Sequence, residues 1–151
     1  MDKYELMAEA LKEARIAYAE DEVPIGCIIA KDGEIIARAH NTKVQKRNTL
    51  NHAEINAINI ASEYLDLWYL DECELYVTLE PCMMCTGAIV NSRIRKVYFA
   101  TDDPKGGSLI SNIRLSEVKR LNHYPEIETD IYKEEASELL KDFFRNKRKQ
   151  K

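Results

Sequence analysis

The sequence has no long apolar run. Nowhere does it approach the roughly 20 consecutive apolar residues that a membrane-spanning helix needs, so we do not expect a membrane protein. The first residues, Met1-Asp2-Lys3-Tyr4-Glu5, lack the basic and apolar segments of a secretory signal, which favours a cytoplasmic location. A chain of 151 residues without an internal repeat, low-complexity block or linker predicts one domain that spans residues 1–151.

Cysteine is also sparse. Disulfide scaffolds are typical of short secreted chains that are rich in cysteine, and four cysteines in 151 residues are too few for one. Cys82 and Cys85 are three residues apart, a spacing that favours a shared metal ion in a reducing compartment. Cys27 and Cys73 need no special role.

Acidic residues outnumber basic ones, but not at the C-terminal end. The formal net charge is −4, whereas residues 145–151 hold five positive side chains and no acid, so that residues 1–144 carry −9. This basic C-terminal tail is a candidate for contact with phosphate groups. Many short basic termini are only solvated, frayed ends. The charge pattern alone does not decide between a phosphate-binding tail and a solvated terminus.

The apolar pattern predicts an α/β fold. An Asp-Gly step at residues 32–33, between two β-rich runs, is typical of an antiparallel hairpin. Further on, a strand, a helix and a strand follow one another, which predicts a parallel crossover. The expected helices cover residues 3–19, 53–65, 82–91 and a closing stretch from 136 to 144; the expected strands cover 25–30, 35–40, 75–79, 97–100 and 127–132; residues 41–51 and 109–125 carry no clear pattern. This order implies a mixed central sheet with helices on both faces.

Two short segments carry the chemistry. His52-Ala53-Glu54 and Pro81-Cys82-Met83-Met84-Cys85 together offer three side chains that suit zinc, namely His52, Cys82 and Cys85, and one carboxylate that is not a ligand. Three protein ligands leave one position of a tetrahedral zinc for a water molecule, which the metal acidifies for nucleophilic attack. We therefore expect one catalytic zinc per chain and hydrolytic chemistry.

Both segments are expected at helix starts. Cys82 and Cys85 would share one helical face, with Pro81 in the first turn and the positive helix end favouring thiolates. His52 and Glu54 can face one point only if His52 is the N-cap, because residues two apart on a helix point in nearly opposite directions. Glu54 can then move protons between the water and the substrate as a general acid and base. A redox pair is the alternative for the cysteines, but it does not call for a His-Ala-Glu segment.

Several further runs match a known family. Beyond the two metal segments, these runs are Glu22-Val23-Pro24-Ile25-Gly26, Ala39-His40-Asn41, residues 75–82, Ser92-Arg93-Ile94, residues 102–107 and Phe143-Phe144-Arg145. In this combination the chain resembles the bacterial tRNA adenosine deaminases of the cytidine-deaminase-like superfamily over nearly its whole length. The resemblance implies a three-layer α/β/α sandwich. It also implies a zinc-dependent homodimer that converts the wobble adenosine of a tRNA anticodon loop to inosine.

The resemblance further implies substrate contacts. Asn41 would hydrogen-bond the purine, and the Ala53 backbone would touch it. Three residues, Val23, Pro24 and Ile25, would help to wall the pocket. Four others match positions that line the RNA path, where phosphate contacts and base stacking are expected; these are Asp103, Lys105, Phe144 and Arg145.

Two departures from the family pattern flank the expected mouth of the pocket. Asn48-Thr49-Leu50-Asn51 replaces the usual Pro-Thr-Ala before the histidine, and the loop between Gly107 and Leu109 is a few residues shorter. Access loops decide whether a free base, a nucleoside or an RNA loop can enter. Three hypotheses therefore stand: a tRNA adenosine deaminase, a deaminase of a free nucleobase or nucleoside (guanine, cytosine or cytidine type), and a noncatalytic zinc-stabilised RNA-binding protein. The breadth of the match favours the first, and Glu54 argues against the third.

Overall fold

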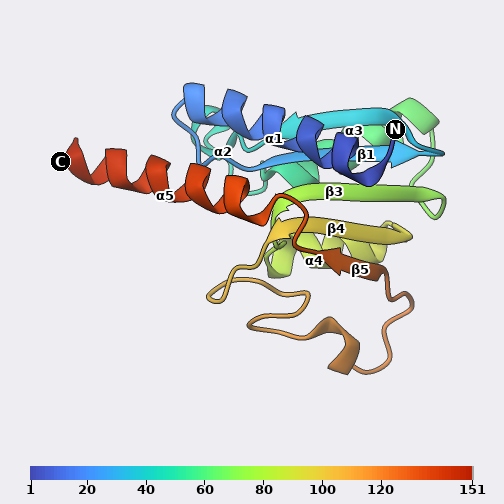
Figure 1. Cartoon of the computed structure of the whole chain (residues 1–151). Helices are drawn as coiled ribbons and strands as arrows, with labels where there is room; N and C mark the ends of the chain where they lie inside the picture. The colour runs from blue at the N-terminus through green and yellow to red at the C-terminus, as the bar shows by residue number, and fades with distance from the viewer. Residues whose placement is uncertain (151) are drawn as a thin grey trace.

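A five-stranded mixed sheet forms the centre of the molecule in the computed structural model, which describes residues 1–150 (Figure 1). The strands are β1 (Gly26–Lys31), β2 (Glu34–His40), β3 (Cys73–Leu79), β4 (Lys96–Thr101) and β5 (Glu126–Thr129), in the order β2-β1-β3-β4-β5. β1 is antiparallel to β2 and to β3, whereas β3, β4 and β5 are parallel to one another. The predicted hairpin and the predicted parallel crossover are both confirmed.

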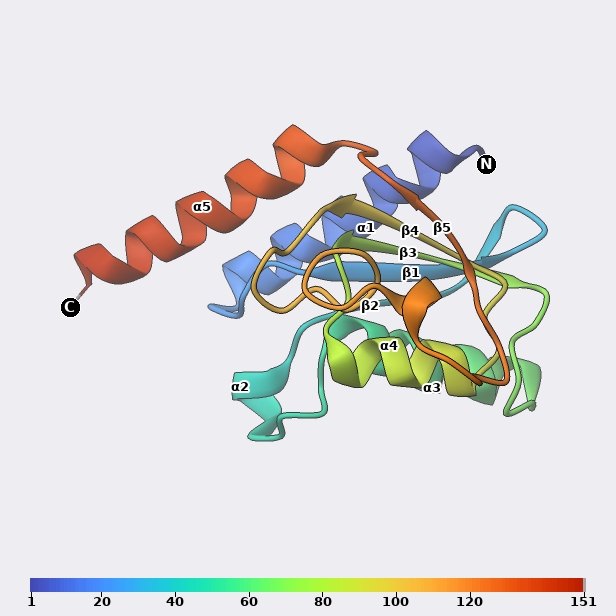
Figure 2. The ribbon, with the colours of Figure 1, turned by 90° about the horizontal axis from the view of Figure 1, so that it is seen from below.

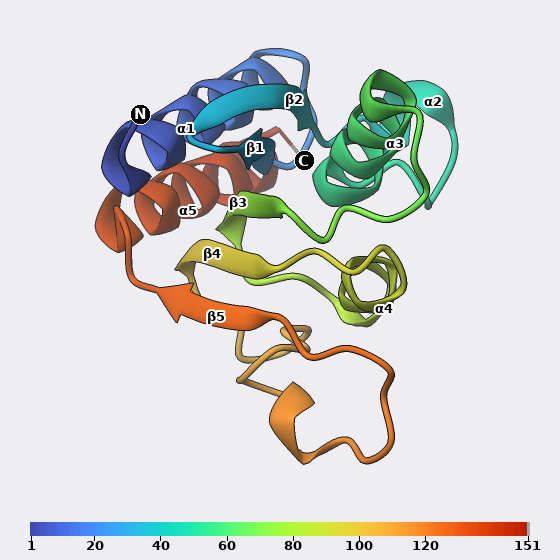
Figure 3. The same ribbon diagram turned by 90° about the vertical axis from the view of Figure 1, so that its right-hand side faces the viewer.

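Helices cover both faces of this sheet. They are α1 (Lys3–Ala19), α2 (Lys43–Lys46), α3 (Ala53–Leu65), α4 (Met83–Asn91) and α5 (Lys133–Lys149), with a short 3₁₀ helix at Leu115–Glu117. Figure 3 shows α1 and α5 on one side of the strands and α3 and α4 on the other. The predicted three-layer α/β/α sandwich is therefore confirmed. Within residues 1–150, no helix combines the length and the apolar character that a bilayer span requires.

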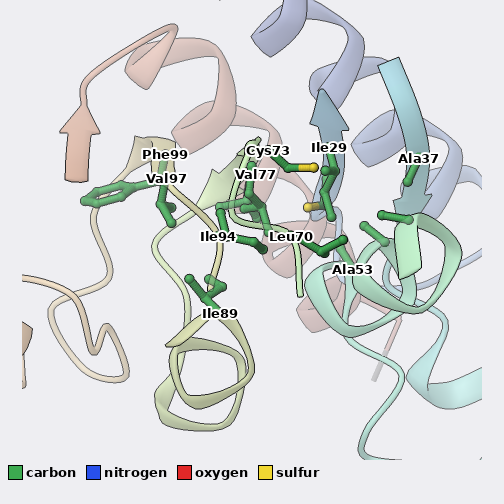
Figure 4. Packing of buried hydrophobic residues seen from close by; sticks show 14 of the residues in the cluster. Ile29, Ala37, Ala53, Leu70, Cys73, Val77, Ile89, Ile94, Val97 and Phe99 are labelled. Atoms are coloured by element: carbon green, nitrogen blue, oxygen red, sulfur yellow. The ribbon is translucent and has the colours of Figure 1, made fainter. Parts of the chain in front are cut away.

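Packing against the sheet fixes where α3 begins. Its inward face carries Ala53, Ala57 and Ala61, one turn apart and all fully buried, so the helix axis can approach the strands closely. Figure 4 shows Ala53 within the apolar cluster that also contains Ile29 of β1 and Ile89 of α4. A second apolar cluster lies on the opposite face, between the sheet and helices α1 and α5. Packing against the apolar core therefore fixes the position of the first turn of α3.

The structure corrects several expected boundaries. Cys82 is the N-cap of α4, which begins at Met83, so Cys82 is not inside the helix and Pro81 precedes the first turn instead of occupying it. Residues 43–46 form α2 where no pattern was recognised, and β5 ends at Thr129. α5 continues through the basic segment to Lys149, because Asn146 donates to Tyr18 Oη and Lys147 pairs with Asp21 at 2.6 Å on the neighbouring helix end.

The outer half of α5 extends past the end of the sheet (Figures 1 and 2). There it lies beside the carboxyl ends of β3 and β4, since Leu79 and Thr101 share a groove with Phe144 and Arg145. In open α/β sheets, ligand sites lie outside the carboxyl ends of the parallel strands. This end of the molecule is therefore where a binding site is expected.

Candidate active site

Three potential metal ligands converge where α3 and α4 begin. Nδ1 of His52 lies 3.6 Å from Sγ of Cys82 and 3.5 Å from Sγ of Cys85, and the three ligand atoms all lie within 4.8 Å of one another. His52 is the N-cap of α3, with extended backbone angles (φ −71°, ψ 156°), as predicted. Cys82 is the N-cap of α4, and Cys85 is its third helical residue. At the start of a helix, the side chain of the N-cap residue and that of the third helical residue approach each other, as they do in a capping box. The two sulfur atoms therefore face one point, although only Cys85 is helical.

The chemistry of this group suits a divalent metal. The pKa of Cys82 is lowered to about 3, because the thiol of Cys85 and the imidazole of His52 both hydrogen-bond its thiolate. The pKa of Cys85 is raised, because it donates to that thiolate and is buried. Binding of a dication would displace the proton of Cys85 and leave both cysteines as thiolates. Two sulfurs and an imidazole are a donor set consistent with zinc.

Glu54 lies beside these ligands, in the first turn of α3, as predicted. Its side chain is 4 % exposed. Burial raises the pKa of Glu54 to about 7, and the negative charge of Cys82 acts in the same direction. A carboxyl group tuned in this way can accept and return a proton near neutral pH, which is the property that a general acid and base requires.

A cavity of about 210 Å³ opens over Glu54 and the ligand group. Besides His52, Glu54 and Cys82, five of the expected substrate contacts line it, namely Val23, Ile25, Asn41, Ala53 and Asp103. Pro24 is buried and is not among the lining residues. The cavity is also lined by three residues that were not expected from the sequence, namely Lys43, Leu79 and Glu80. Lys43 and Leu79 have no local signal that distinguishes them from other loop and strand residues.

Asn41 is held in one orientation in the cavity wall. Its side-chain oxygen accepts from the backbone N–H of Lys43 at 3.1 Å, and its Nδ2 donates to the carbonyl of Val23 at 3.4 Å. Its own backbone N–H donates to the carbonyl of Ile25 at 3.1 Å. The side chain is buried. A fixed amide of this kind can recognise the edge of a heterocyclic base by hydrogen bonds.

Glu80 anchors the loop on the other side of the cavity. Its carboxylate accepts from the backbone N–H groups of Asp103 (3.1 Å), Leu109 (3.1 Å), Ile110 (2.8 Å) and Ser111 (3.0 Å), and from the hydroxyl of Ser111. Burial alone would raise the pKa of Glu80, but these hydrogen bonds outweigh it and the pKa is lowered. The loop therefore closes around a buried negative charge, and this places Asp103 at the mouth of the cavity.

Glu80→Gln is expected to destabilise the protein. In the native protein, backbone N–H groups donate to both oxygens of the Glu80 carboxylate, but a glutamine would place an NH₂ group against some of these donors. Each buried N–H group left without an acceptor costs about 1–3 kcal/mol. Thermal unfolding tests this, since the midpoint of a chain of this size falls by about 2–4 °C for each kcal/mol. Glu63→Gln, an exposed change on α3, is the control and is expected to leave the midpoint unchanged. Equal midpoints for the two variants would contradict an anchoring role for Glu80.

The four residues expected to line an RNA path do not all lie in one cavity. Phe144 and Arg145 lie outside the cavity and instead line a neighbouring groove of about 500 Å³ between α5 and the sheet. Leu79 lines both, so the groove and the cavity adjoin. Lys141 and Arg148 add two further positive side chains to the groove. Lys105 is not among the lining residues of either.

The chain is similar over nearly its whole length to known deaminases. Residues 1–148 match the family model described as MafB19-like deaminase. The chain is 46 % identical to the tRNA-specific adenosine deaminase of Bacillus subtilis (strain 168) over 145 residues, which cover 96 % of this chain and 90 % of that protein. A solved structure from studies of A-to-I editing by tRNA:A34 deaminases at the wobble position of transfer RNA is 40 % identical, has a TM-score of 0.89, and aligns over 91 % of this chain and 100 % of its own.

A guanine deaminase from Bacillus subtilis is also similar, with 36 % identity and a TM-score of 0.65, but the match covers 68 % of this chain and 66 % of that one. The tRNA-specific adenosine deaminases are the relatives that combine 40 % identity or more with a match over nearly the whole chain. The chain therefore belongs to the MafB19-like deaminases and, within them, to the family of the bacterial tRNA-specific adenosine deaminases.

Proposed function

We propose that this protein hydrolyses the amino group of the wobble adenosine in a tRNA anticodon loop, which yields inosine and ammonia. The observation that carries the proposal is a buried carboxylate, Glu54, beside the His52-Cys82-Cys85 group in a cavity of about 210 Å³. The near full-length similarity to tRNA-specific adenosine deaminases supports adenosine in tRNA as the substrate.

In this proposal His52, Cys82 and Cys85 hold one zinc ion per chain. When bound, zinc supplies a Lewis acid that makes water nucleophilic near neutral pH. Glu54 would take one proton from the attacking water and deliver it to the ring nitrogen, and would then carry the second proton, from the newly added hydroxyl group, to the amino group, which leaves as ammonia. Asn41 and the backbone of Ala53 hold the purine edge, and Val23 and Ile25 pack against its faces.

A free nucleobase or nucleoside is the second candidate substrate. The similarity to a guanine deaminase favours it, as does the changed sequence at residues 48–51. The direct test incubates zinc-loaded protein with an anticodon stem-loop, free adenosine, guanine, cytosine and cytidine. Inosine in the stem-loop without turnover of the small molecules is expected, and faster turnover of a free base would reject the proposal.

The groove beside α5 is the surface that we propose for the RNA backbone. Lys141, Arg145 and Arg148 give it positive charge next to the cavity, and Phe144, which is 45 % exposed, offers a ring for base stacking. Lys147 differs from these residues, because its ammonium group pairs with Asp21 at 2.6 Å on the α1 side of the helix, whereas Arg145 makes only a longer ion pair of 3.9 Å with Asp142. The helix therefore presents basic residues toward the groove and one basic residue, Lys147, that is held by a short ion pair on its other side, which allows the two kinds to be compared.

The double substitution Arg145→Gln/Arg148→Gln is expected to weaken binding of an anticodon stem-loop. Each lost phosphate contact should reduce the slope of log affinity against log salt by about 0.7–0.9. Titrations at several salt concentrations measure this, with zinc content as a check on the site. Lys147→Gln removes the same kind of charge and should change the slope little. Unchanged affinity and slope in the double variant would mean that this end of α5 is only a solvated helix terminus.

We also propose that the protein is cytoplasmic and acts as a homodimer, as its family resemblance implies. An apolar groove between α4 and residues 113–121 supports the dimer, since Met83 at its edge is 67 % exposed. Sedimentation at the mass of one chain would argue against the dimer.

A further inference from the structure

One side chain outside the cavity joins the segments that carry Asn41 and His52. Asn56 lies on α3, one turn after His52. Its Nδ2 donates to the carbonyl of His40 at 3.0 Å and to the hydroxyl of Thr42 at 3.0 Å, while its Oδ1 accepts from Nδ2 of Asn51 at 2.9 Å. The amide of Asn56 thus uses both of its N–H groups and its oxygen.

The partners of Asn56 are neighbours of the two functional residues. His40 and Thr42 flank Asn41 in the chain, and Asn51 directly precedes His52. A further hydrogen bond links the same two segments, since the backbone N–H of Thr42 donates to the carbonyl of Asn51 at 3.0 Å. Through these contacts Asn56 ties the wall of the cavity that bears Asn41 to the helix start that bears His52.

Asn51 is also one of the residues at which the sequence departs from its family pattern. Its side chain does not reach into the cavity, and instead it points to Asn56. The departure therefore has an internal partner on the adjacent helix. A buried or half-buried pair of amides fixes a unique alignment when every group is satisfied, whereas a pair that loses one member leaves polar groups unpaired.

We propose that Asn56, with Asn51 as its partner, is a positioning residue that sets the place of Asn41 relative to His52 and so sets substrate orientation. The inference rests on the proposed deaminase function, because it assigns Asn41 to the substrate. Asn56 itself does not line the cavity and touches neither substrate nor metal in this proposal.

A double-mutant cycle tests it. In zinc-loaded protein, Asn56→Ala should lower kcat/KM for the anticodon stem-loop about 10- to 100-fold, since a displacement of about 1 Å in a positioned group can cost that much. On an Asn41→Ala background the same change should cost less than about threefold, because residues that act as a unit are not additive. Asn51→Ala, which removes a single bond to Asn56, should show a smaller loss in the same direction and serves if Asn56→Ala folds poorly.

Asn59→Ala is the matched control. Asn59 is an exposed asparagine one turn further along α3 and makes no side-chain hydrogen bond within residues 1–150, so its removal should change kcat/KM less than about twofold. The metal content of every variant is measured and should remain one zinc per chain. Equal losses from Asn56→Ala on the wild-type and Asn41→Ala backgrounds would show a general structural role and overturn the proposal.

A second readout does not depend on activity. Asn56→Ala should increase hydrogen exchange at the backbone amide of Thr42 at least about tenfold, because the bond to the Asn51 carbonyl loses its support, while exchange at Ile29 in β1 stays unchanged. Unchanged protection of Thr42 would overturn the proposal. If the wild-type protein makes no inosine, the proposed function fails, and this exchange measurement alone decides whether Asn56 aligns the two segments.

Discussion

We expect Glu54→Gln to retain zinc and the fold but to lose deamination by at least about 10²- to 10⁴-fold, the contribution typical of a general acid and base. The side chain keeps its size and its place in the first turn of α3, but an amide cannot shuttle a proton. The loss should appear in kcat, because proton transfer occurs in the reaction step and not in binding. Single-turnover rates on an anticodon stem-loop, with metal analysis of the same sample, measure it.

Glu63→Gln is the control for this variant, because it makes the same chemical change at an exposed position of the same helix. It should leave turnover and zinc unchanged. Near-normal turnover in Glu54→Gln would remove Glu54 from the mechanism. Loss of zinc in Glu54→Gln would instead mean that the carboxylate supports the metal, which is contrary to the role proposed for it.

The second large effect is expected at the ligands. Cys82→Ala and Cys85→Ala should each lose zinc and all detectable deamination. Loss of a hydrogen-bonding partner of a ligand already costs about 10–100-fold in metal affinity, and loss of one of three ligands should cost more. Metal analysis after dialysis against a weak chelator measures this, and the thermal midpoint shows whether the fold persists without the ion.

Cys73→Ala supplies the matched comparison. Cys73 is a buried cysteine at the start of β3, at the opposite end of the strand from Cys82, and it takes no part in the ligand group. The variant should lose some packing energy but keep one zinc per chain. Full zinc and full activity in Cys82→Ala or Cys85→Ala would place the metal elsewhere.

The placement of His52 and Glu54 could be derived from the sequence because helix geometry leaves few choices. Two residues that are two apart can face one point only at a helix boundary, and the structure has His52 at the N-cap. The same reasoning placed Cys82 inside its helix, because an N-cap followed by a residue at N3 has the same spacing as two helical residues one turn apart. Sequence spacing alone does not separate these two arrangements.

Glu80 and Asn56 could not be recognised from the sequence. A glutamate after a strand and an asparagine on a helix are ordinary solvent-facing residues unless another segment packs over them. Their partners lie up to 31 residues away, in loops and at the end of β2, so only the tertiary structure brings them together. The continuation of α5 through the basic segment escaped prediction for a similar reason, since it depends on contacts with α1.

Glu80 binds its loop almost entirely through backbone N–H groups of the loop, and this affects how the substrate range can diverge. Backbone N–H groups are present in every residue except proline, so the anchor places few demands on the side chains above it. A β-carbon at Gly107 would approach the Glu80 carboxylate to 2.3 Å, so that position must stay glycine. With that glycine and the buried Leu109 kept, and with proline excluded at residues 103 and 109–111, the exposed side chains of the loop can vary. The mouth can therefore change through these side chains, by evolution or by design, while the floor with His52, Cys82 and Cys85 stays the same.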